Sequence, residues 1–313
     1  MLSVVVPAYN EQEMIVKAAK RIGSTLIKAD IDFEIIFIDD GSSDETWPTI
    51  KAISEANDRI FGIHFSRNFG KEAAMFAGLE MAKGDCVAVM DCDLQHPPHV
   101  LPRMYALWQE GYEVVEGMKS SRGSESKSHA ANAGLFYKLM TKATGFDMAD
   151  SSDFKLLDRK VVDTLNALPE KAVFFRALSF WAGYKRTSVE YKVAEREAGK
   201  SKWSTKSLIK YAVTNVTSFS SAPLNIVTIL GALTFVIAFI MGLIAVIQKI
   251  CGVALGGFTT VIILLLLIGS IIMLSLGIIG IYIAKIYDEV KGRPRYIISE
   301  ISGKTAGAQE TLN

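Results

Sequence analysis

Cysteine is scarce in this sequence, and neither sign of charge is in excess. The three cysteines, Cys86, Cys92 and Cys251, are odd in number and follow no paired spacing, which argues against a disulfide framework or a zinc site and fits a reducing compartment. Lysine and arginine number 34 against 33 aspartate and glutamate, a net charge of +1. Because no basic field covers the chain, we expect no nucleic-acid partner.

Charged side chains are also missing from two long stretches near the C-terminus, residues 211–248 and 250–284. As helices, residues 224–247 and 258–284 would be about 36 and 40 Å long, enough to cross a hydrocarbon core of about 30 Å with some tilt. Two buried helices of a soluble core are the alternative. The N-terminus has no basic start followed by a long apolar block, so we expect residues 1–200 to stay on the side of synthesis.

Basic residues are distributed unevenly around these two stretches. Two lysines, Lys206 and Lys210, precede the first stretch, only Lys249 lies between the two, and four basic residues follow the second: Lys285, Lys291, Arg293 and Arg295. The positive-inside rule therefore predicts that both ends lie in the cytoplasm. Apolar residues at helical spacing within residues 206–219 predict a helix on the membrane surface.

The first 120 residues alternate short apolar runs with segments of helical spacing. The runs that we interpret as strands are residues 2–6, 34–38, 60–65, 86–90 and 113–116. A helix joins each strand to the next as a crossover connection. The strands should therefore be mostly parallel, in an α/β, Rossmann-like fold. Ligands of such sheets bind beyond the carboxyl ends of the strands. Polar segments follow three of the predicted strands, so we look for chemistry there.

One such segment carries Asp91 and Asp93, with Gln95 two residues further on. Alternate carboxylates at a strand end, with a neutral oxygen ligand beside them, favour Mg²⁺ or Mn²⁺, since both prefer hard oxygen ligands and leave room for a nucleotide's phosphates. A solvated acidic turn is the alternative. The position of the pair at the predicted carboxyl edge favours the metal.

A second segment carries Asp39, Asp40 and Asp44 around a Gly-Ser-Ser turn. We interpret Asp44 as a turn and helix cap. The neighbouring carboxylates of Asp39 and Asp40 repel each other unless a group donates to them. A nucleobase or a ribose hydroxyl would serve.

Two other groups of polar residues have simpler interpretations. In residues 67–71 we expect Asn68 to cap a helix and Lys71 to be a solvated first-turn residue, with no part in catalysis. The four histidines suggest a metal site only superficially, because prolines interrupt the spacing of His96 and His99. We do not expect a histidine metal site.

Four motifs occur in order along the chain: VVPAYNE at residues 5–11, IDDGSSDET at 38–46, MDCDLQHPP at 90–98 and DFKLLDR at 153–159. Together they resemble family 2 glycosyltransferases of GT-A fold. Within that family, the chain is similar to the branch of dolichol-phosphate mannose synthases and bactoprenol glycosyltransferases. The resemblance extends from residue 1 to about residue 290.

The resemblance implies transfer of a sugar, with inversion, from a nucleotide-diphosphate donor such as UDP-glucose or UDP-N-acetylglucosamine to a polyisoprenyl phosphate. It implies a base and ribose pocket, a group facing the donor sugar or ribose (Asp91), and a divalent cation, Mg²⁺ or Mn²⁺, on Asp93 and Gln95. The residues it implies for the base and ribose pocket are Pro7, Tyr9, Glu11 and Asp40.

For the acceptor side, the resemblance implies that Asp153 is the catalytic carboxylate and that Arg196, Ser201 and Lys202 contact phosphate. A phosphate monoester is already largely ionised at neutral pH, so Asp153 can orient rather than deprotonate. A helix-capping or loop-closing carboxylate is the simpler alternative. The chain lacks the Gln-x-x-Arg-Trp pattern of processive synthases, which argues for transfer of a single sugar.

These expectations divide the chain into four parts. Residues 1–200 form a cytoplasmic catalytic domain, 201–222 an interfacial amphipathic helix, 223–285 a transmembrane hairpin and 286–313 a cytoplasmic tail. A non-catalytic membrane protein, whose degenerate domain binds a nucleotide sugar or a partner subunit, is the rival interpretation. The sequence leaves the oligomeric state open, including a homo-oligomer.

Overall fold

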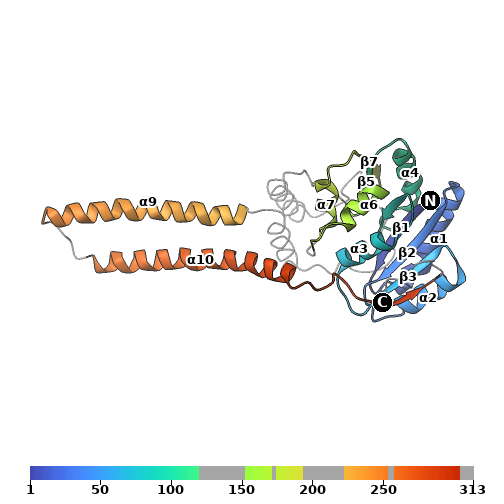
Figure 1. Ribbon diagram of the computed structural model, residues 1–313, viewed down its shortest axis with the longest axis horizontal. Coiled ribbons are helices and arrows are strands. Elements are labelled where there is room, and N and C mark those ends of the chain that lie inside the picture. Colours follow the sequence, from blue (N-terminus) through green and yellow to red (C-terminus); the bar gives the residue numbers. More distant parts are fainter. Residues whose placement is uncertain (120–151, 171–173, 193–221, 253–256, 304–313) are drawn as a thin grey trace. The chain divides into compact units, whose positions relative to one another are not determined.

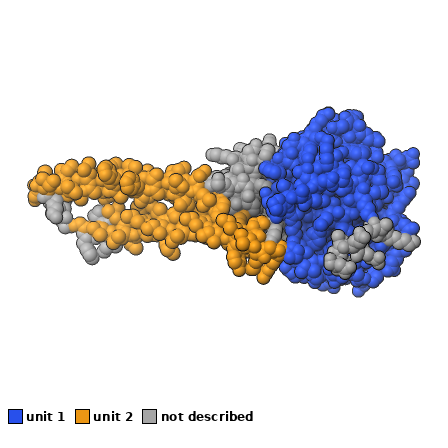
Figure 2. Space-filling model, in the orientation of Figure 1, with its two compact units in different colours: residues 1–204, 294–313 blue, residues 205–293 orange. Residues whose placement is uncertain are grey.

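The computed structural model describes residues 1–119, 152–170, 174–192, 222–252 and 257–303. The chain forms two compact units, which are coloured separately in Figure 2. Unit 1 contains Met1–Ser204 together with Pro294–Asn313, and unit 2 contains Thr205–Arg293. The predicted interfacial helix at 206–219 lies outside the described residues.

Unit 1 is built on a mixed, mostly parallel sheet with the strand order β7-β5-β6-β4-β1-β2-β3-β8. The strands are β1 Leu2–Ala8, β2 Phe33–Asp39, β3 Ile60–Phe65, β4 Cys86–Val89, β5 Val114–Lys119, β6 Lys155–Asp158, β7 Arg186–Tyr191 and β8 Ile298–Ser302. The first four pair in parallel, as do β5 and β7, whereas β6 and β8 are antiparallel to their neighbours. The α/β class and all five predicted strands are confirmed.

The helices of unit 1 follow the predicted crossover pattern (Figure 1). They are α1 Gln12–Lys28, α2 Thr46–Ala56, α3 Lys71–Met81, α4 Leu101–Gln109, α6 Arg159–Asn166 and α7 Phe175–Trp181, with the short 3₁₀ turn η1 Pro98–Val100. Helix α1 buries the apolar side chains at its helical spacing, from Met14 to Leu26, against the core. Gly78 lets α3 approach β1, because a Cβ atom there would lie 2.2 Å from Val5.

Strand direction brings distant segments to one edge of the sheet. Strands β1, β2, β4, β5 and β7 run in the same direction, so their carboxyl ends share that edge. Strand β6 runs the opposite way, so residues 152–154, which precede it, lie at this edge as well. The residues after β4 and those before β6 therefore meet, although about 60 residues separate them along the chain.

The chain returns to the sheet after its last helix, which the sequence analysis did not predict. The ring of Tyr296 stacks on Phe65 of β3 with centroids 5.0 Å apart. The indole N–H of Trp47 donates to the Glu300 carboxylate at 2.9 Å, and Lys51 forms an ion pair with the same group. Strand β8 thereby covers the edge of β3 and ties the C-terminal segment into unit 1.

We expect Tyr296→Ala to lower the free energy of unfolding of unit 1 by about 1–2 kcal/mol, because it removes a half-buried ring stacked on Phe65. Chemical denaturation of the full chain in detergent, followed by tryptophan fluorescence, measures this change. Ile297→Ala is the matched control, since the neighbouring side chain is 51% exposed. Equal losses for the two variants would contradict a stabilising role for the returning segment.

In the described part of unit 2, helices α9 Ala222–Ile250 and α10 Phe258–Val290 lie side by side in Figure 1. Segments Pro223–Gln248 and Leu264–Val290 are long and apolar enough to cross a membrane. Large apolar side chains on both helices face outward; Phe235 and Met273, for example, are each 70% exposed. Helices of a soluble core would bury these side chains, so the described residues favour membrane spans over that alternative.

Candidate active site

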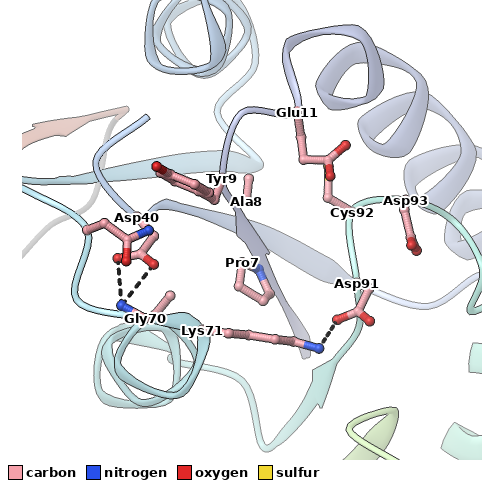
Figure 3. A pocket seen from close by; sticks show the side chains of 12 residues that line it. Pro7, Ala8, Tyr9, Glu11, Asp40, Gly70, Lys71, Asp91, Cys92 and Asp93 are labelled. Atoms are coloured by element: carbon pink, nitrogen blue, oxygen red, sulfur yellow. Dashed lines mark hydrogen bonds and ion pairs between the residues drawn. The ribbon is translucent and has the colours of Figure 1, made fainter. Parts of the chain in front are cut away.

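A pocket of about 350 Å³ opens at the carboxyl edge of the sheet in unit 1. Figure 3 shows Tyr9 and Asp40 on one side, Asp91 and Asp93 on the other, and Lys71 reaching across from α3. The lining residues are Pro7, Ala8, Tyr9, Glu11, Asp40, Asn68, Gly70, Lys71, Ala74, Asp91, Cys92 and Asp93. The pocket thus gathers all the residues that the sequence analysis placed on the base, the ribose and the donor sugar.

The carboxylates of Asp39 and Asp40 both find donors within the protein. Asp40 accepts the backbone N–H groups of Phe69, at 2.7 Å, and of Gly70, at 2.9 Å. Asp39 is fully buried and bonds to His64 Nδ1 at 2.7 Å. Burial raises the pKa of Asp40, although these N–H groups oppose the shift. A nucleotide is therefore not needed to relieve the repulsion between the pair, and Asp40 faces the pocket already held in place.

The start of α3 differs from the sequence prediction. Gly70 precedes the helix with φ of 101°, a conformation that favours glycine, and no side chain caps this end. The prediction that Asn68 is the cap was therefore wrong. Asp44 accepts the Thr46 N–H at 3.0 Å in the expected turn, but Glu45 precedes α2 and no side chain caps it, so Asp44 is not the helix cap. Asp40 holds the Gly70 N–H and so fixes the first turn of α3.

Lys71 is in the first turn of α3 and 43% exposed, as predicted, but its ammonium group is held by two carboxylates, which the prediction did not include. Its Nζ lies 2.6 Å from Asp91 Oδ1 and 2.8 Å from Asp153 Oδ2. Neighbouring carboxylates outweigh the effect of burial and raise the pKa of Lys71, so it is a permanent cation. The ammonium group bridges Asp91, which follows β4, and Asp153, which precedes β6.

Asp153 is buried and is held by two cations. Its side chain is 8% exposed, and besides Lys71 it accepts Arg176 Nε at 2.6 Å and Arg176 Nη2 at 3.0 Å. Burial alone would raise the pKa of Asp153, but Lys71 and Arg176 outweigh it and hold the pKa well below its usual range. Asp153 is therefore a fixed anion and a very weak base, and it does not simply cap a helix.

The backbone around Asp153 is anchored by a second buried pair. The Lys155 ammonium lies 3.1 Å from the Glu116 carboxylate and donates to Ser179 Oγ at 2.8 Å. Glu116 also accepts the Ser152 N–H at 2.9 Å. Residues on both sides of Asp153 are thereby tied to β5, which limits how far its carboxylate can move.

Glu72 links α3 to α7, the helix that carries Arg176. Its carboxylate accepts the Phe175 N–H at the start of α7, at 2.9 Å. Burial and the nearby Asp153 raise the pKa of Glu72 to about 7. The adjacent residues Lys71 and Glu72 therefore both contribute to the contact between α3 and the Asp153 region, and the sequence analysis missed Glu72 and Arg176.

The loop after β4 presents Asp93 to the pocket. The Gln95 N–H donates to Asp93 Oδ1 at 3.1 Å, which turns the loop back on itself. Among the described residues, no group of three or more His, Cys, Asp and Glu side chains forms a complete metal cage. The donor set still suits Mg²⁺ or Mn²⁺, because these ions take one or two carboxylates and complete their shell with water and substrate phosphates.

His96 supports the same loop from inside. The backbone N–H of Asp91 donates to His96 Nδ1 at 3.2 Å, and the imidazole stacks on Phe154 with centroids 5.0 Å apart. Burial lowers the pKa of His96, so the ring is neutral and accepts this hydrogen bond. His96 therefore connects the segments that carry Asp91 and Asp153. The predicted phosphate contacts Arg196, Ser201 and Lys202 lie outside the described residues.

Comparisons with known proteins find a matching family model and relatives of nearly full length. The model of glycosyl transferase family 2 matches residues 3–165. The uncharacterized glycosyltransferase YkcC of Bacillus subtilis is 37% identical over 303 residues, covering 96% of this chain and 94% of that protein. The prophage bactoprenol glucosyl transferase homolog of Escherichia coli is 36% identical over 302 residues, covering 96% and 99%.

Among solved structures, the chain is similar to glucosyl-3-phosphoglycerate synthase from Mycobacterium tuberculosis, at 21% identity and a TM-score of 0.48, over 70% of this chain and 80% of that one. The family model spans half of the chain, and the relatives match nearly all of it. The chain therefore belongs to glycosyl transferase family 2.

Proposed function

We propose that this protein transfers one sugar from a nucleotide-diphosphate sugar, UDP-glucose or UDP-N-acetylglucosamine, to the phosphate of a polyisoprenyl lipid such as undecaprenyl phosphate. The observation that carries the proposal is the pocket lined by Asp91 and Asp93, where Lys71 joins Asp91 to the buried Asp153. The described residues also include two helices of membrane-spanning length. A relative of nearly full coverage named as a bactoprenol glucosyl transferase supports the lipid acceptor.

The donor would occupy the pocket along the carboxyl edge. Tyr9, which is 41% exposed, offers a ring face to the base, and Asp40 offers its remaining acceptor capacity to the base or ribose. Pro7 and Glu11 complete this wall. The sugar would then lie toward Asp91 and Asp153, and the diphosphate between the two regions.

Asp93, with Asp91 and Gln95 nearby, would hold the divalent cation. When bound, Mg²⁺ or Mn²⁺ neutralises negative charge on the departing nucleoside diphosphate. Lys71 keeps the two carboxylates of Asp91 and Asp153 in fixed positions before the substrates arrive, so little reorganisation is needed during the reaction.

On the acceptor side, the nucleophile is an oxygen of the lipid phosphate, which attacks the anomeric carbon from the face opposite the leaving group. The phosphate has a second pKa near 6 and is already ionised at neutral pH. Asp153 therefore orients the reacting groups through Lys71 and Arg176 and removes no proton. We assign Arg196, Ser201 and Lys202 to the phosphates at the membrane surface.

A donor screen with the purified full chain tests the proposal. The assay combines undecaprenyl phosphate, Mg²⁺ or Mn²⁺ and a panel of UDP-, GDP- and dTDP-sugars, and lipid-linked sugar is the readout. We expect product from a UDP-hexose. Binding of a nucleotide sugar without transfer from any donor would favour the rival non-catalytic protein.

We also propose a topology in which both flanks of the hairpin are cytoplasmic. Unit 1 contains residues on both sides of α9 and α10, and one folded unit lies on one side of a membrane. This supports the proposed division into a catalytic domain at 1–200, an interfacial helix at 201–222, a hairpin at 223–285 and a cytoplasmic tail at 286–313. Homo-oligomers are compatible with it.

Native Cys251 makes the topology testable, because it is exposed at the end of α9, whereas Cys86 and Cys92 are buried. We expect a membrane-impermeant maleimide added to intact cells to label Cys251. A Cys251→Ser, Lys291→Cys variant should react only after the membrane is permeabilised. Labelling of both positions from the same side would contradict the hairpin.

A further inference from the structure

Tyr191 lies at the active-site edge but has no place in the function proposed above. It is the last residue of β7 and pairs with Lys119 at the end of β5, so it lies at the carboxyl edge of the sheet. Its ring packs edge-on against Phe154, at 5.6 Å between centroids, and against His96, at 6.0 Å. These are the residues beside Asp153 and behind Asp91.

The hydroxyl group of Tyr191 is buried without a hydrogen bond. The residue is 3% exposed, and its hydroxyl oxygen has no hydrogen-bond partner among the residues that the structure describes. A buried polar group without a partner destabilises the fold. Phenylalanine would fill the same space against Phe154 and Gly117 without this cost, so the hydroxyl is better explained by a partner that binds later.

The surroundings define the chemistry of that partner. Burial and the carboxylates of Asp91 and Asp153 raise the pKa of Tyr191, so the phenol stays protonated and is a donor. Ionised carboxylates can only accept hydrogen bonds. A group that lies between the carboxylates and Tyr191 must therefore donate a hydrogen bond to a carboxylate and accept one from the phenol. A sugar hydroxyl does both, whereas a phosphate oxygen only accepts and so cannot bond to either carboxylate.

We infer that the Tyr191 hydroxyl donates a hydrogen bond to a hydroxyl group of the transferred sugar, which makes Tyr191 a sugar-specificity residue. This inference rests on the proposed function, because it takes the pocket to hold a nucleotide sugar. The phenol would complete its hydrogen bonding only when the sugar is in place. A donor that lacks the matching hydroxyl would leave the phenol unpaired and would be discriminated against.

Tyr191→Phe tests the inference, with Tyr184→Phe as the matched control, since the Tyr184 hydroxyl bonds to Thr164 at 2.6 Å in another part of unit 1. Calorimetry with Mg²⁺ gives the dissociation constants of UDP-glucose and of UDP. We expect Tyr191→Phe to bind UDP as the wild type does. The dissociation constant of UDP-glucose divided by that of UDP should rise about tenfold. The variant's denaturation midpoint should be unchanged or higher. The control should leave the ratio unchanged.

Deoxy donors identify the contact. We test UDP-glucose analogues deoxygenated at position 2, 3, 4 or 6. For the wild type, one analogue should bind about tenfold more weakly than UDP-glucose. For Tyr191→Phe, the same analogue should bind as tightly as UDP-glucose. An unchanged ratio in Tyr191→Phe, for UDP-glucose and for UDP-N-acetylglucosamine alike, would overturn the inference. So would a loss of UDP affinity or of stability, since either indicates a structural hydroxyl.

These binding measurements do not depend on turnover. If the wild type binds a UDP-sugar and makes no lipid product, the proposed function fails while the change in the ratio still decides the role of Tyr191. If the wild type makes product and the ratio is unchanged in Tyr191→Phe, the inference fails and the proposed function stands.

Discussion

Replacing Asp93 with asparagine should lower the rate of sugar transfer about 1,000-fold, because the leaving diphosphate would lose the cation that neutralises it. Asp93 lies in a half-exposed loop after β4 and lines the pocket. The substitution should therefore change the free energy of unfolding by less than about 0.5 kcal/mol. Initial transfer rates at saturating donor and acceptor, measured across a Mg²⁺ titration, give the effect.

Asp85→Asn provides the matched control. This carboxylate precedes β4, at the opposite edge of the sheet from Asp93, where it pairs with the N-terminal amine and is 70% exposed. Its replacement should leave transfer unchanged. Near wild-type transfer by Asp93→Asn in chelator-treated buffer would refute the metal role of this residue.

Replacing Asp153 with asparagine should lower the rate about 100-fold without changing the form of its dependence on pH. In the wild type, the carboxylate pKa lies well below its usual range because Lys71 and Arg176 surround it, so Asp153 stays ionised throughout the working range. The rate should instead rise as the lipid phosphate takes its second charge, near pH 6. The asparagine variant loses the charge that positions Lys71 and Arg176, but the nucleophile, the lipid phosphate, is unchanged.

The measurement is the rate against pH for both proteins at saturating substrates, under conditions where the chemical step limits turnover. Because the folded-state pKa of Asp153 is lowered, its contribution to stability is present above the unfolded-state value and is lost only as the pH falls toward acid. A falling rate near pH 6 therefore does not reflect unfolding from this group. Disappearance of the inflection in Asp153→Asn would instead assign the titrating group to the protein, either to Asp153 or to Glu72, whose pKa of about 7 is raised by burial and in part by Asp153.

The parts of the fold that depend on local pattern were predictable from sequence. The apolar face of α1 and the buried runs of β1 to β4 follow periodicities that burial imposes on a helix and on a parallel strand. The polar segments after those strands meet at one edge because parallel strands place them there. The sequence therefore predicted that these segments converge, whereas the assignment of Tyr9 and Asp40 to a base and ribose pocket came from the family resemblance; all three of Tyr9, Asp40 and Asp93 line one pocket.

The contacts that depend on long-range packing were not predictable. Lys71 looks like any basic residue in the first turn of a helix, and its partner Asp153 is 82 residues away. Arg176 lies on a short helix that contacts α3 through residues distant in sequence, Glu72 and Phe76 with Phe175. Strand β8 is short and pairs with β3 from the far end of the chain, so nothing local distinguishes it from a loop.

The most direct test of the central claim is to identify the lipid product that the purified chain makes from UDP-glucose and undecaprenyl phosphate in the presence of Mg²⁺. Mass spectrometry counts the sugars added, and NMR gives the configuration at the anomeric carbon. We expect undecaprenyl phosphate carrying one hexose, with the configuration opposite to that of the α-linked donor. A product that retains the donor's configuration, or that carries a chain of sugars, would contradict this expectation.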